Sequence, residues 1–315
     1  MKMRIRAFVL LWLFAAAAQA QQIVHIVVPF AAGGVQDILA RTLAPELGQL
    51  LGKNVIVENR LGASGTIGNA MVAKSAPDGN TLLLSAASHT ITGHVYAKLP
   101  YHPIRDFTAV AHIGTVDYVL MVNPALPAKT VAEFIAYAKA NPGKLNYASA
   151  GAGSATHLSM AYFASLTGID MVHVPYKGTN EAVNEVLAGR ADAVIASTIG
   201  ALGFTKDPRI RMLGVTGAAR SKFVPELPTL AESGVPGYAF DSWMGLLGPA
   251  GIPKATVDAI NAAVGRELKD PALLERLDKQ GVVPRALSPE EFAALLREDY
   301  ARMGRVVKAA GARIE

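Results

Sequence analysis

Residues 23–41 read IVHIVVPFAAGGVQDILAR, and this stretch decides the fold. The apolar, β-branched run 23–28 predicts a strand, and after Pro29 and Phe30 a glycine-containing loop opens into a helical pattern. Glycines let the backbone approach a ligand closely, and the first amides of a helix have no partner within the helix. With the positive end of the helix dipole, these amides predict an anion site. The alternative is that Gly33 and Gly34 only form a tight turn.

Two more transitions of the same kind follow. The strand pattern 55–58 leads into the glycine-rich turn 59–68, and the strand pattern 81–84 leads into residues 85–88. Strands that alternate with helices in this way predict a parallel sheet covered by helices on both faces. In such sheets a ligand lies beyond the carboxyl ends of the strands.

A second α/β series begins after the proline-rich break 123–127. Its most informative segment is the loop 149–156, which is rich in glycine and hydroxyl side chains and opens a helix near His157. Beyond residue 249 the pattern is nearly all helical, and helices without strands cannot build a sheet of their own. We therefore expect the tail to cover the first domain.

This organisation predicts two domains after a signal peptide at 1–20. Domain 1 is discontinuous and comprises 21–123 plus 239–315, and domain 2 comprises 124–238. The two hinge crossovers are expected near 122–125 and 236–241. Two lobes that face each other with glycine loops form a cleft that can close on a small ligand.

The first twenty residues have the features of a secretory signal peptide. Lys2, Arg4 and Arg6 precede twelve apolar residues, 7–18, and an A-x-A cleavage site ends at Ala20. Twelve apolar residues are too few to span a bilayer, so we expect cleavage after Ala20 and residence in the periplasm. The segment holds three of the 30 Lys and Arg residues, so 27 remain against 25 Asp and Glu, a net charge of +2.

The sequence lacks the motifs that are typical of several classes of function. The remaining basic residues form no cluster with interleaved aromatics, which argues against nucleic-acid binding. The chain has no cysteine, which excludes disulfides and a thiolate nucleophile. The sequence has no nucleophile elbow, phosphate-binding loop or zinc-binding H-E-x-x-H pattern. We therefore predict no catalytic residue, no metal and no cofactor, while a triad assembled from distant residues stays open.

These motifs closely resemble the Bug family, the periplasmic substrate-binding proteins of tripartite tricarboxylate transporters. The resemblance covers essentially the whole mature chain. It rests on residues 28–34 with Asp37 and 40–41, and on 57–68, 77–83, 151–158, 174–178, 187–192 and 243–251.

The resemblance implies an α/β, two-lobed periplasmic binding protein of the Venus flytrap, type II-like class. Each lobe would be a central sheet flanked by helices, and two hinge crossovers would join the lobes. It further implies a monomeric, non-catalytic receptor for a small carboxylate, whether a di- or tricarboxylate, an amino acid or an aromatic carboxylate. The implied partners are the membrane subunits of a tripartite tricarboxylate-type transporter.

The resemblance also implies the ligand contacts. First-loop amides would hold a carboxylate, and second-lobe hydroxyls and amides would hold the other end. Carried onto this sequence, the contacts are Phe30, Ala32, Gly34, Asp37, Gly65, Thr66, Ser88, Ser154, Ala155 and Thr156, with Tyr176 and Trp243 as candidates for the cleft wall. The family often has a small or hydroxylated residue after the glycine pair, whereas Val35 and Gln36 follow it here. Either the ligand differs from those of relatives or the backbone contacts suffice.

Alternative interpretations remain for some residues and for the function. Asp37 either pairs with Arg41, four residues on, or contacts an amino group or bridging water of the ligand. Ser154 and Thr156 are also typical helix N-caps. A ligand sensor that presents its closed form to a signalling partner, and a hydrolase with a dispersed active site, are the alternatives to a transport receptor.

Overall fold

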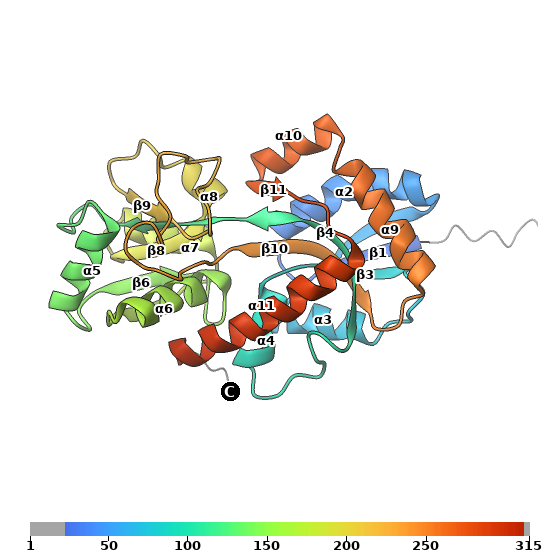
Figure 1. The fold of residues 1–315 in the computed structure, drawn as a ribbon, viewed down its shortest axis with the longest axis horizontal. Helices are drawn as coiled ribbons and strands as arrows, with labels where there is room; N and C mark the ends of the chain where they lie inside the picture. The colour runs from blue at the N-terminus through green and yellow to red at the C-terminus, as the bar shows by residue number, and fades with distance from the viewer. Residues whose placement is uncertain (1–22, 312–315) are drawn as a thin grey trace, which may run out of the picture.

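The computed structural model describes residues 23–311, which form two α/β lobes (Figure 1). The predicted signal peptide and its cleavage site lie outside the described residues. Within 23–311, no helix has both the length and the apolar character needed to cross a membrane. Each lobe has its own sheet with helices around it, which confirms the predicted two-lobed architecture.

The first lobe is built on a six-stranded sheet in the order β2-β1-β3-β10-β4-β11. Its strands are β1 (Ile23–Val28), β2 (Asn54–Asn59), β3 (Thr81–Ala86), β4 (Phe107–Val116), β10 (Ser242–Pro249) and β11 (Val282–Pro284). β1, β2 and β3 are parallel, but β10 is antiparallel to both of its neighbours, β3 and β4. The parallel arrangement predicted from the first three strands is confirmed, but the complete sheet is mixed, because β10 returns from the other lobe and enters from the opposite end. β11 lies in the tail predicted as nearly all helical, and three residues are too few to show alternation.

Helices cover both faces of this sheet (Figure 1). One face carries α2 (Val35–Leu51), α9 (Lys254–Glu267) and α10 (Pro271–Lys279); the other carries the short η1 (Ala63–Gly65), α3 (Thr66–Ala73), α4 (Ser88–Val95) and α11 (Pro289–Ala310). In β3, Leu82 and Leu84 are buried in the cluster with α2 and α9, whereas Leu83 is buried in the cluster with α4 and α11. The tail thus returns to the first lobe, as predicted.

The second lobe has a five-stranded sheet in the order β7-β6-β8-β5-β9. Its strands are β5 (Tyr118–Val122), β6 (Asn146–Ser149), β7 (Val172–Pro175), β8 (Ala193–Ser197) and β9 (Arg211–Val215), and its helices are α5 (Val131–Ala140), α6 (Ala155–Thr167), α7 (Thr179–Leu187) and α8 (Thr198–Leu202). β6 is parallel to β7 and β8, and β5 is antiparallel to β8 and β9.

The first crossover between the lobes lies at a different point from the one expected, whereas the second lies where it was expected. Asp117 alone separates β4 from β5, and β5 pairs with β8 and β9 of the second lobe. The first crossover therefore lies at Asp117, before the predicted 122–125, and 118–123 belong with the second sheet. The Phe240 amide still donates to Thr216 of the second lobe, and β10 of the first sheet begins at Ser242, so the second crossover lies within the predicted 236–241. The first boundary was misplaced because the sequence patterns of β4 and β5 look like two consecutive strands of one domain. Only their pairing partners show that they belong to different sheets.

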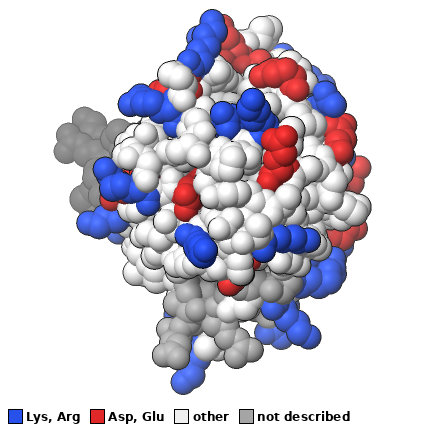
Figure 2. All heavy atoms as spheres, turned by 90° about the vertical axis from the view of Figure 1, so that its left-hand side faces the viewer, with Lys and Arg blue, Asp and Glu red and all other residues white. Residues whose placement is uncertain are grey.

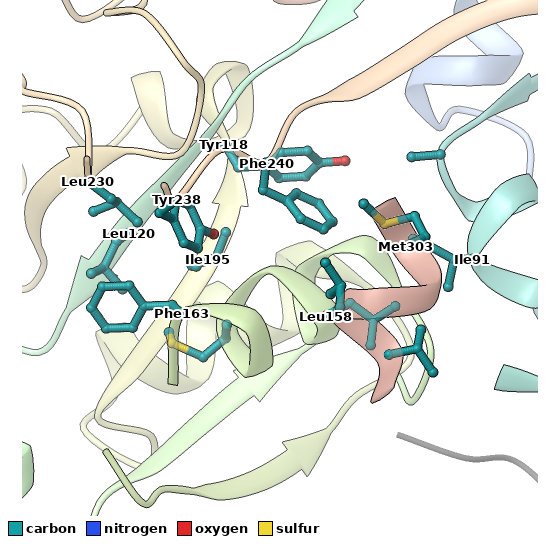
Figure 3. Packing of buried hydrophobic residues seen from close by; sticks show 14 of the residues in the cluster. Ile91, Tyr118, Leu120, Leu158, Phe163, Ile195, Leu230, Tyr238, Phe240 and Met303 are labelled. Carbon is teal, nitrogen blue, oxygen red and sulfur yellow. The ribbon is translucent and has the colours of Figure 1, made fainter. Parts of the chain in front are cut away.

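One buried apolar cluster continues from one lobe into the other (Figure 3). Tyr118 and Phe240 contribute to it from the two crossovers, and Met303 of α11 lies near Leu158 of α6. α11 thus contacts the second lobe through α6 as well as the first lobe through α4. Because packed apolar surface joins the lobes on the α11 side, we expect opening and closing to occur on the opposite side of the crossovers.

Candidate functional site

A cavity of about 240 Å³ lies between the lobes. Its polar lining residues are Gln36, Ser88, Tyr118, Ser154, Thr156, Thr179, Ser197 and Ser242, and its apolar ones are Phe30, Val35, Ala86, Val116, Ala150, Ala155 and Met244. The two glycine loops predicted to face each other, those around Gly34 and Gly153, therefore border one shared cavity.

Four helices begin at this cavity. The first residues of α2 (Val35 and Gln36), of α4 (Ser88), of α6 (Ala155 and Thr156) and of α7 (Thr179) all line it. Gly34 and Gly178, the N-caps of α2 and α7, make no side-chain capping hydrogen bond. First-turn amides and the positive ends of four helix dipoles thus meet in one small volume. None of the residues that line the cavity, all within the described chain, carries a formal charge.

Asp37 fixes the conformation of the first glycine loop through hydrogen bonds. Its carboxylate accepts hydrogen bonds from the Gly33 amide (2.9 Å), Arg41 Nε (3.0 Å) and Asn59 Nδ2 (2.9 Å), and its exposure is only 3%. Burial alone would raise the pKa of Asp37. The hydrogen bonds from Arg41, Gly33 and Asn59 together outweigh this effect, so the pKa lies below its ordinary value. The expected pairing with Arg41 is confirmed. The carboxylate does not line the cavity, so the contacts that the structure gives Asp37 are those that shape the loop.

Gly65 affects the cavity indirectly, through the position of the Phe30 ring. It has a φ of +90°, and a Cβ built there would lie 3.2 Å from Pro29 Cβ and 3.3 Å from Phe30 Cζ. Asn59 Nδ2 fixes the same loop by donating to the Phe30 carbonyl at 3.0 Å. The glycine therefore leaves room for the ring of Phe30, which lines the cavity. Thr66, the next residue, is 7% exposed and lies outside the lining.

We expect Gly65→Ala to weaken ligand binding about fivefold to tenfold and to destabilise the fold by about 1–2 kcal/mol. A side chain is strained at this φ, and the new Cβ would displace the Phe30 ring. Titration calorimetry and thermal unfolding measure the two effects. The matched control is Gly203→Ala, since Gly203 has a φ of −62° and open space around its Cβ position. Equal affinities for Gly65→Ala and wild type would contradict this role of Gly65.

Hydrogen bonds to its own hydroxyl groups fix the conformation of the second loop, 149–156. Thr156 Oγ1 accepts from the Ala150 amide at 2.9 Å and shares a hydrogen bond of 3.0 Å with Ser154 Oγ. Ser154 Oγ also accepts from the His157 amide at 3.2 Å, so it is the N-cap of α6. The capping interpretation of Ser154 is thus confirmed, and Ser154 also lines the cavity. Ser88, Ala155 and Thr156, three more of the predicted ligand contacts, line the cavity as well.

Some predicted contacts do not line the cavity. Ala32 and Gly34 lie in the first loop beside lining residues, outside the lining itself. The Tyr176 hydroxyl donates to Glu185 at 3.3 Å within the second lobe. Trp243 is 2% exposed and its Nε1 donates to Asp299 at 3.0 Å. Neighbouring residues of a strand face opposite sides, so Ser242 and Met244 line the cavity and Trp243 faces α11.

Several lining residues were missed. Thr179 follows Gly178 and opens a helix, so the glycine-then-helix signal used for the first loop would have found it. Tyr118, Ser197 and Ser242 lie at strand ends beside the crossovers. No local motif marks them, because their place in the cavity depends on how the two sheets meet.

A family described as "Tripartite tricarboxylate transporter family receptor" matches residues 39–312. BugT of Bordetella pertussis is 33% identical over 294 residues, which are 93% of this chain and 90% of BugT. The chain belongs to the receptor family of tripartite tricarboxylate transporters. The resemblance to Bug proteins is thereby confirmed.

Solved structures of similar proteins share the two-lobed fold of this receptor. A protein from R. palustris with adipate has a TM-score of 0.83 and 34% identity, over 94% of this chain and 100% of that one. MatC from Rhodopseudomonas palustris with bound malate has a TM-score of 0.78 and 33% identity, over 90% of this chain and 98% of MatC. The fold is therefore that of a periplasmic binding protein, as the motifs implied.

Proposed function

We propose that this receptor binds a small carboxylate in the cavity between its lobes and delivers it, as a periplasmic monomer, to membrane subunits of its transporter. The observation that carries the proposal is the meeting of the α2, α4, α6 and α7 N-termini in a cavity of about 240 Å³ without a charged side chain. Helix N-termini favour an anion. The relatives solved with adipate and malate support the same class of ligand.

The lining favours a carboxylate that carries no ammonium group. A buried ammonium group is stabilised best by a carboxylate partner, and the lining contains none. Asp37 was the one candidate, and its oxygens already accept from Gly33, Arg41 and Asn59. Phe30, Val35 and Met244 provide apolar surface for the carbon chain or ring of the ligand. We therefore favour aliphatic or aromatic carboxylates over amino acids.

The same lining favours a receptor over a hydrolase. Its serines, Ser88, Ser154, Ser197 and Ser242, have no histidine or carboxylate beside them in the lining that could activate a hydroxyl. On the end of the second lobe shown in Figure 2, basic and acidic side chains are interspersed, so this face presents no uniformly positive surface to an anion. At the cavity, recognition would rest on the local field of the helix ends.

Titration calorimetry of protein purified from the periplasm tests the proposal. The panel pairs adipate with adipamide, and glutarate with glutamate, and adds malate and benzoate. We expect at least one carboxylate to bind with a stoichiometry of one, adipamide not to bind, and glutarate to bind more tightly than glutamate. A hundredfold excess over Kd should stabilise the fold by about 2.7 kcal/mol. Binding of the neutral amide with equal affinity, or sustained consumption of a ligand, would refute the proposal.

A further inference from the structure

A stacked pair of histidines lies beneath the second-lobe loop. His157, in the first turn of α6, and His173, on β7, have ring centroids 3.9 Å apart and an angle of 13° between their planes. Tyr147 of β6 extends the stack, with its ring 5.0 Å from His173. Neither histidine lines the cavity. Three elements of the second lobe thus meet directly behind the residues that do line it.

Each histidine is bonded to the loop. His157 Nδ1 accepts from the Gly153 amide at 3.0 Å. His173 Nε2 shares a hydrogen bond of 2.6 Å with Ser149 Oγ, which in turn accepts from the Gly151 amide at 3.1 Å. Gly151 and Gly153 have φ values of +114° and +75°, so these two bonds fix the residues whose backbone is otherwise the least restricted.

The protonation state suits this arrangement. Burial, with His173 adding to it, lowers the pKa of His157 to about 4, and burial lowers the pKa of His173. Both rings are therefore neutral at pH 7. A neutral His157 with its proton on Nε2 keeps the lone pair on Nδ1 that the Gly153 amide requires.

We propose that His157 and His173 are positioning residues for the ligand, which set the 149–156 loop in its ligand-facing form without touching the ligand. The inference rests on the proposed function for its ligand, but the loop geometry can be tested without any ligand. If His157 were only a core residue, an apolar ring or chain of similar size would serve equally. If it positions the loop, its Nδ1 acceptor is what matters.

The test compares His157→Leu with His157→Asn. The asparagine side-chain oxygen lies close to the place of Nδ1 and keeps an acceptor for Gly153, whereas leucine fills the space without one. Hydrogen exchange at the Gly153 amide, followed by NMR at pH 7 without ligand, should be at least tenfold faster in His157→Leu and near wild type in His157→Asn. The ¹⁵N shifts of wild-type His157 should report the neutral form with its proton on Nε2.

Affinity for adipate and malate gives the second measurement. We expect His157→Leu to bind at least tenfold more weakly, His157→Asn to bind within threefold of wild type, and His173→Leu to weaken binding as well. Unchanged exchange at Gly153 in His157→Leu, or equal losses in the leucine and asparagine variants, would overturn the inference. If wild type binds neither compound, the proposed function fails for these ligands, and the exchange result still decides whether His157 sets the loop.

Discussion

Replacing Asp37 by asparagine is expected to weaken carboxylate binding about 100-fold and to destabilise the fold by about 2–3 kcal/mol. The carboxylate accepts from three donors, the Gly33 amide, Arg41 Nε and Asn59 Nδ2. An asparagine side chain has a single oxygen. Its NH2 group would replace the second carboxylate oxygen and would face one of these N–H donors. Hydrogen bonds to a charged group contribute about 1.5–3 kcal/mol each, so the loop loses its main support. Titration calorimetry and denaturant unfolding measure the two losses.

The loss at Asp37 should not depend on whether the ligand has an amino group, because the carboxylate does not line the cavity. Glutarate and glutamate should therefore lose affinity by similar factors. The matched control is Asp258→Asn, which removes an exposed carboxylate that also pairs with a basic residue one helical turn away, Lys254. We expect the control to change neither quantity measurably. A selective loss for glutamate would show instead that Asp37 contacts the ligand.

The pH dependence gives an independent check on Asp37. Its pKa is lowered in the folded protein, so its contribution to the free energy of unfolding is complete above the ordinary aspartate pKa near 3.8. That contribution is lost as pH falls through the lowered value. The difference in stability between wild type and Asp37→Asn should therefore be constant from pH 5 to 7 and shrink in stronger acid.

The parts of the site that the sequence predicted are those encoded by neighbouring residues. The strand, loop and helix order around Gly33, the Asp37–Arg41 pair and the Ser154 cap all depend on residues within a few positions of each other. Ser154 and Thr156 line the cavity because they sit at the N-terminus of α6, whose preceding loop faces the other lobe. Local motifs were sufficient to place these residues at the cavity.

The parts that the sequence missed depend on pairing between distant strands. Trp243 and Ser242 are neighbours, and only the register of β10 against β3 and β4 decides which of them faces the cavity; the pairing with β4 contains two irregularities. Asp117 likewise marks the first crossover only because β5 pairs with β8 and β9. The convergence of α7 with α2 is also a property of the assembled lobes. A single sequence contains no signal for such distant pairings.

Glu267→Gln is expected to stabilise the fold by about 3 kcal/mol at pH 7. Glu267 on α9 is 3% exposed, and neither carboxylate oxygen has a hydrogen-bond partner among the described residues. Burial, with Glu46 of α2 adding to it, raises the pKa of Glu267 to about 8. The folded protein therefore keeps this carboxyl neutral at pH 7, whereas the unfolded chain ionises it above about pH 4.5.

The sign of this effect follows from the raised pKa. A proton is retained in the folded state and lost in the unfolded state, so the stability of wild type falls as pH rises from about 4.5 to about 8. Glutamine has nothing to ionise, so the gain in Glu267→Gln should grow over that range and level off above it. The control, Glu275→Gln, removes an exposed carboxylate paired with Lys279 and should leave stability unchanged within the error of the measurement. Urea unfolding at several pH values measures the difference in the free energy of unfolding. If the stabilities of Glu267→Gln and wild type changed with pH in parallel, Glu267 would be ionised in the folded protein as well as in the unfolded chain.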